Sequence, residues 1–125
     1  MAWLSRPLSI LTPLLIAGVA LSSCGVGGAV SEARESCRYV HKALAIEQRS
    51  SAPSLSPTQK ANLEATALAE LLKGTQAAAE ATSIDGSWNA LQTTINEAER
   101  VPLSDVVASL TRICHVADSS SPYLN

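Results

Sequence analysis

Cys24 stands out as a reactive side chain because it follows an apolar stretch near the amino terminus. Residues 8–21 are apolar apart from Ser9, Thr12 and Pro13, and one cation, Arg6, precedes them. This layout is typical of a secretory signal peptide. The apolar run of about 14 residues is shorter than the ~20 that a helix needs to span a bilayer. The sequence therefore predicts export, with residues 1–23 as the signal peptide.

The residues Leu21-Ser22-Ser23-Cys24 resemble the lipobox of bacterial prolipoproteins, in which an aliphatic residue and two small residues precede a cysteine. The resemblance implies a diacylglyceryl group on the Cys24 thiol and cleavage between Ser23 and Cys24. Acyl chains such as palmitate would then hold the mature protein at the outer face of the cell membrane, and two chains give stable anchoring. The abundant Ala, the excess of Arg over Lys and the absence of Phe are also similar to small exported lipoproteins of actinobacteria such as mycobacteria.

Two alternatives for this segment stay open. An ordinary signal peptide cut elsewhere, for example after Ala29, would leave a soluble secreted protein without Cys24. An uncleaved segment would instead remain as an anchor.

The chain has three cysteines, so Cys37 and Cys114 are the two that remain once the resemblance assigns Cys24 to lipid. Two such cysteines in a small exported domain usually form a disulfide. A Cys2His2 metal site with His41 and His115 is one alternative, and two free thiols are the other. However, His115 is turned roughly 100° from Cys114 on a helix, which argues against this site. We therefore predict a Cys37–Cys114 disulfide and no metal or cofactor.

The size and charge of the mature chain limit its function. Removing residues 1–23 from 125 leaves 102, a size at which one domain folds alone. The whole chain has 9 Lys plus Arg and 11 Asp plus Glu, so loss of Arg6 leaves a net charge of about −3. Nucleic-acid binding calls for a basic face, and we expect no nucleic-acid partner.

Apolar residues recur at spacings of three and four along the mature chain, which predicts helices. The expected elements are a Gly-rich tether at 24–30, helices at 31–48, 56–81, 88–100 and 104–118, and a flexible tail at 119–125. Ser31 and Ser104 are the expected N-caps of the first and last helices. The second begins with a capping box, Ser56-Pro57-Thr58-Gln59. Gly74 within that helix, at a cost of ~1 kcal/mol relative to Ala, predicts a bend or a close approach by another helix.

These elements predict an all-α fold, a small antiparallel four-helix bundle over residues 31–118 that the disulfide closes. Its scattered carboxylates mostly fall off the apolar stripes and are expected to be solvated; they include Glu64, Glu70, Glu80, Glu97 and Glu99. No serine lies in a nucleophile motif, so we predict no catalytic residues and no enzyme. The leading interpretation is a binding or scaffolding module of the cell envelope. The alternative is a carrier of a small apolar ligand or lipid, in a cavity near Trp88 and residues 74–79.

Overall fold

The computed structural model describes residues 26–123, so the predicted signal peptide and Cys24 lie outside the described part. Within it the chain is all-helical, as the sequence predicts. Its elements are α1 (Val26–Ser50), α2 (Pro57–Leu72), α3 (Thr75–Ile84), the short 3-10 helix η1 (Gly86–Trp88), α4 (Asn89–Glu97) and α5 (Leu103–Asp118). None of these helices is both long and apolar enough to cross a membrane.

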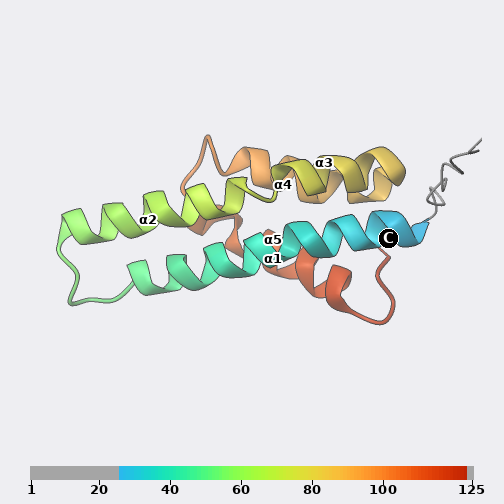
Figure 1. Ribbon diagram of the computed structural model, residues 1–125. Coiled ribbons are helices and arrows are strands. Elements are labelled where there is room, and N and C mark those ends of the chain that lie inside the picture. Colours follow the sequence, from blue (N-terminus) through green and yellow to red (C-terminus); the bar gives the residue numbers. More distant parts are fainter. Residues whose placement is uncertain (1–25, 124–125) are drawn as a thin grey trace, which may run out of the picture.

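The longest helix, α1, is the element on which the others assemble. Figure 1 shows α2 and α3 following one another along α1, and α5 packs against α1 as well. α4 contacts both α3 and α5 and so completes the core. The largest fully buried side chains in this core are Trp88, Leu71, Leu91, Ile95 and Leu110. Many of the remaining buried positions are Ala, whose small side chain lets helices pack closely.

The amino-terminal part of α1 differs from the predicted tether at residues 24–30. The helix is already formed at Val26, and Ser31 lies inside it rather than at its cap. Ala29 and Val30 are buried in the core cluster, four and three residues before Ala33 on the same helical face. Burial of these side chains offsets the cost of about 1 kcal/mol that each glycine adds to a helix.

The start of α2 follows the sequence signal. The Ser56 hydroxyl accepts a hydrogen bond from the Gln59 amide at 3.1 Å, and the Ser56 amide donates to Gln59 Oε1 at 2.9 Å. Both halves of the predicted capping box are therefore present, with Pro57 as the first helical residue. This local geometry fixes where the chain turns back along α1.

Gly74 separates α2 from α3 and lies against α1. A Cβ atom at this position would be 3.0 Å from the backbone oxygen of Ser36 and 3.0 Å from its Oγ. The buried Ser36 hydroxyl donates a hydrogen bond to the Gly74 carbonyl oxygen at 2.9 Å. The predicted helix 56–81 is thus interrupted at Gly74, and α1 also approaches it closely.

The last two helices begin and end differently from the prediction for residues 88–118. α4 ends at Glu97 rather than near Arg100. α5 begins at Leu103, and Pro102 rather than Ser104 occupies the cap position, without a side-chain hydrogen bond. Leu103 and Val106 are buried and Val107 is half-buried, because the buried face of α5 is set by packing against α1 and α4.

The predicted disulfide between Cys37 and Cys114 is present, and it joins α1 to α5. The two Cα atoms are 5.5 Å apart and both side chains are fully buried. Arg34 of α1 donates from Nε to the Ala117 carbonyl oxygen at 2.7 Å, which satisfies a free carbonyl at the end of α5. The α1–α5 contact is therefore held by a covalent bond and by a hydrogen bond one turn away.

Replacement of Gly74 by Ala should destabilise the domain, although Ala is the better helix former. The new methyl group would lie 3.0 Å from a backbone oxygen, and overpacking of this kind costs about 1 to 3 kcal/mol. Gly86→Ala is the matched control, since a Cβ there meets no atom within 4 Å. Urea denaturation measures both variants. A Gly74→Ala protein as stable as the wild type would show that the α1 contact is not tight.

Removal of the disulfide should destabilise the domain at least as much as truncation of its best-buried leucines. The bond closes a loop with a sequence separation of 77, for which loop entropy gives an upper limit of about 4 to 5 kcal/mol. Leu71→Ala, at a fully buried site, should cost about 2 to 5 kcal/mol. The denaturation midpoints of the Cys37→Ala/Cys114→Ala and Leu71→Ala proteins show which change costs more stability. A larger loss for Leu71→Ala would show that the helical core is sufficient by itself.

Candidate binding groove

The cysteines and histidines that the sequence suggested as possible metal ligands lie on α1 and α5. Cys37 and Cys114 are bonded to each other, so neither is a free thiolate that could bind a metal. His41 Nε2 lies 2.7 Å from Asp118 Oδ2, and both side chains are largely exposed. His115 is exposed beside the disulfide. Across residues 26–123, no three His, Cys, Asp or Glu side chains gather in a way that could hold a metal ion.

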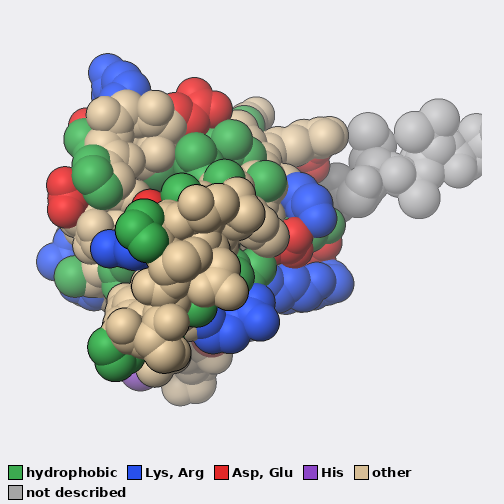
Figure 2. Space-filling view, turned by 90° about the vertical axis from the view of Figure 1, so that its left-hand side faces the viewer, with side chains coloured by type: hydrophobic (Ala, Val, Ile, Leu, Met, Phe, Trp, Pro, Cys, Tyr) green, Lys and Arg blue, Asp and Glu red, His purple; other side chains and the backbone are tan. Residues whose placement is uncertain are grey.

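A groove elsewhere lies between α1, α2 and the segment that leads into α5, and its walls are largely apolar. Its volume is about 310 Å³. The residues that line it are Glu47, Ala61, Glu64, Ala65, Leu68, Ala98, Val101, Pro102, Leu103 and Ser104. Figure 2 looks at the end of the molecule that carries the α1–α2 loop and shows hydrophobic side chains gathered above the tan atoms at the centre, with charged side chains around them. The groove therefore combines an apolar lining with two carboxylates.

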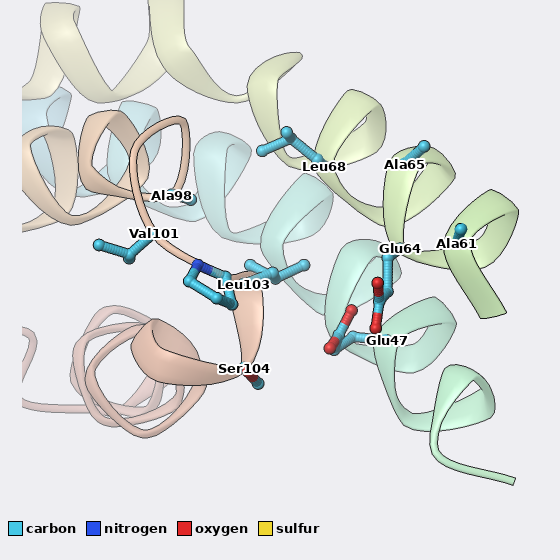
Figure 3. Close-up of a pocket in the computed structure, with 10 residues that line it drawn as sticks. Glu47, Ala61, Glu64, Ala65, Leu68, Ala98, Val101, Leu103 and Ser104 are labelled. Carbon is cyan, nitrogen blue, oxygen red and sulfur yellow. The ribbon is translucent and has the colours of Figure 1, made fainter. Parts of the chain in front are cut away.

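The two carboxylates come from different helices and face one another. Figure 3 shows Glu47 of α1 and Glu64 of α2 pointing toward each other, with Leu103 reaching toward them from the start of α5. The Oε2 atom of Glu47 is buried and has no hydrogen-bond partner in the described structure. Glu64 has a partner, because Lys60 Nζ lies 3.7 Å from its Oε1. Glu64 therefore has a cation beside it, whereas the Oε2 atom of Glu47 has no hydrogen-bond partner.

The surroundings of Glu47 disfavour its charged form. Burial of the carboxyl, and secondarily the nearby Glu64 carboxylate, raise the pKa of Glu47 above its ordinary value of 4.5. Lys60 acts in the opposite direction but does not cancel these two effects. A positive group bound next to Glu47 would remove this penalty, because it favours the ionised carboxylate.

A second hollow adjoins the groove and shares Glu47 and Ser104 with it. Its volume is about 410 Å³, and Leu44, Val107 and Thr111 also line it. Glu47 therefore stands between the groove and a hollow that lies between α1 and α5. Of the described residues that line either hollow, none is Lys, Arg or His.

No protein-family model, curated protein or solved structure matches this chain. The chemistry of the groove accordingly rests on its own residues.

The cavity expected around Trp88 and residues 74–79 is not where the groove lies. Trp88 is fully buried, and Gly74 is in contact with Ser36 of α1. The hollow that does adjoin this region is lined mainly by charged and polar side chains, among them Glu35, Lys73 and Glu80. The apolar groove is instead at the other end of α2.

Sequence reasoning missed Glu47, and a signal for it was present. In the sequence Val40 and Leu44 are apolar residues four apart in the predicted first helix, and Glu47 is the next position at a spacing of three. A carboxylate that continues a buried stripe is a candidate for a perturbed acid. Glu64, which was expected to be solvated, is half-buried and forms part of the same groove.

The groove lining combines apolar side chains with two acids and one hydroxyl. General acid–base catalysis needs a proton donor and acceptor held around a reacting atom. In this groove Glu64 lies beside Lys60, Glu47 has an unpartnered oxygen, and the other lining residues are apolar apart from Ser104. Apolar walls bury hydrocarbon, and the unpartnered carboxylate selects for positive charge.

Replacing Glu47 by Gln should raise stability at neutral pH, with a gain that disappears in acid. A carboxyl whose folded-state pKa is raised contributes its full stability below the unfolded value of 4.5 and loses it as pH rises through the folded-state pKa. Wild type and Glu47→Gln should therefore differ most near pH 7 and converge below pH 4.5. Thermal melts across this range measure the difference. Glu80→Gln, on the exposed side of α3, controls for the lost charge; an equal gain there would assign the effect to net charge alone.

Proposed function

We propose that this chain is an exported lipoprotein, anchored through Cys24 at the outer face of the cell membrane, whose helical domain is a non-enzymatic binding module. The lipobox-like Leu21-Ser22-Ser23-Cys24 and the preceding apolar run support the anchor. The Cys37–Cys114 disulfide supports an oxidising compartment outside the cytoplasm, because structural disulfides persist there.

The groove is the main structural support for a role in binding. An apolar hollow with one unpartnered carboxylate oxygen leaves both hydrophobic surface and a charge without a partner inside the domain. A bound molecule supplies both, and seven of the ten lining residues carry no group that could act as a nucleophile or a base. The lining chemistry therefore favours a binding module over an enzyme.

The framework that presents the groove is proposed to be an antiparallel four-helix bundle, with α2 and α3 counted as one interrupted helix. Only Lys73 and Gly74 separate the two, and both helices pack against α1. This arrangement puts the α1–α2 loop and the segment before α5 near the same end, where the groove lies.

A carrier of a small apolar ligand is the second candidate, and the volumes of about 310 and 410 Å³ favour it. Pockets for small molecules commonly span roughly 300 to 1,000 Å³. If the lipobox is not used, the same domain would act as a soluble secreted protein. Envelope binding and ligand carriage share the groove and differ in what occupies it.

Replacement of Cys24 by Ala should abolish membrane attachment. Without the thiol there is no site for the diacylglyceryl group, so the variant should stay unprocessed or be released. Detergent-phase partitioning of cell fractions followed by intact-mass measurement reads out both outcomes. Ser23→Ala, which keeps a small residue before Cys24, should behave like the wild type. Equal partitioning of wild type and Cys24→Ala would rule out the lipid anchor.

A further inference from the structure

The Glu47 carboxylate is the feature of the groove that most needs a partner. Its Oε2 atom is buried without a hydrogen bond, although the Glu47 side chain as a whole is half-buried, and a buried acceptor without a partner is unfavourable. The nearest cation, Lys60, pairs with Glu64 and keeps a 56% exposed side chain. No basic residue lines the groove or the adjoining hollow in the described chain, so a ligand that enters there can place its own positive group against Glu47.

The apolar walls define the rest of the occupant. Leu68 and Val101 are half-buried on facing elements, and Leu103 approaches the acids from the start of α5. Hydrocarbon placed against these side chains would be removed from water, which favours binding. A volume of about 310 Å³ is at the small end for ligand pockets and matches a compact molecule rather than a folded segment.

We infer that the groove binds a small organic amine with an apolar body, placing its ammonium group against Glu47 and its hydrocarbon along Leu68, Val101 and Leu103. This inference rests on the proposed role as a binding module and specifies its ligand class. The ammonium donates a charge-assisted hydrogen bond to the Glu47 carboxylate, which is stronger than a bond between neutral groups. The partly buried position of the carboxylate limits screening by salt.

The raised pKa of Glu47 agrees with this geometry. The free groove disfavours the ionised carboxylate, and the charges that face it are Glu64 and Lys60, both from α2. An ammonium ion next to Glu47 lowers the pKa again, so binding releases a proton when it begins from the protonated acid. Affinity for the amine should therefore fall as pH drops toward the ordinary carboxyl range, because protonation then competes.

The experiment uses the mature chain, residues 24–125, with Cys24→Ser so that it stays unlipidated. Two-dimensional NMR titrations compare three probes with the same hydrocarbon: n-octylammonium, n-octanol and n-octyl sulfate. We expect n-octylammonium to shift resonances of Leu68, Val101 and Ser104 and to bind at least tenfold more tightly than n-octyl sulfate, a difference of about 1.4 kcal/mol.

Two variants with opposite expected effects make the test specific to the carboxylate. Glu47→Gln should weaken n-octylammonium binding about tenfold, equivalent to about 1.4 kcal/mol, while leaving n-octanol unchanged. Lys60→Gln removes the cation that competes for the two acids and should strengthen the binding. Glu80→Gln is the charge-matched control and should leave the affinity as in the wild type.

The remaining outcomes separate this inference from the function on which it rests. Equal affinity for all three probes at the groove would retain a binding site but overturn the choice of a cation. If no probe shifts the groove residues, the inference and the binding role of the groove both fail, whereas the lipid anchor is decided separately by the Cys24→Ala fractionation. Tighter binding of an acetyl-Leu-Lys-Leu amide than of n-octylammonium would overturn the small amine in favour of a protein side chain.

Discussion

The covalent bond between Cys37 and Cys114 is the constraint on which the rest of the domain depends. It joins the first described helix to the last across a sequence separation of 77. The core that it encloses contains many Ala side chains, each of which buries little apolar area. Restriction of the unfolded chain therefore contributes a large share of the stability that larger side chains would supply in another bundle.

Two consecutive residues of α1 position both walls of the groove. Cys37 holds α5 through the disulfide. The Ser36 hydroxyl donates a hydrogen bond to the Gly74 carbonyl oxygen, at the point where α2 and α3 meet against α1. Successive residues on a helix point about 100° apart, so one turn of α1 reaches two different neighbours. The positions of Glu64 on α2 and Leu103 on α5 relative to Glu47 follow from these contacts. The groove is thus a consequence of how the helices are held together, not a separate insertion.

Local signals in the sequence predicted much of this fold, and tertiary effects account for the rest. The capping box at Ser56 could be predicted because both of its hydrogen bonds join residues within one four-residue segment. The early start of α1 was missed because its glycines favour coil locally, while the burial of Ala29 and Val30 depends on distant helices. The environment of Glu47 could not be predicted for the same reason: its stripe position was visible, but its unpartnered oxygen depends on three-dimensional packing.

The early start of α1 also determines where the groove lies relative to a lipid anchor. With Cys24 lipidated, as proposed, only Gly25 intervenes before the first residue of α1. Glu47 follows Val26 by 21 positions, and a rise of 1.5 Å per residue puts it roughly 30 Å farther along the helix axis. Such a helix works as a rigid spacer whose far end carries the binding surface. The groove would then sample solutes of the aqueous envelope rather than lipids still seated in the bilayer.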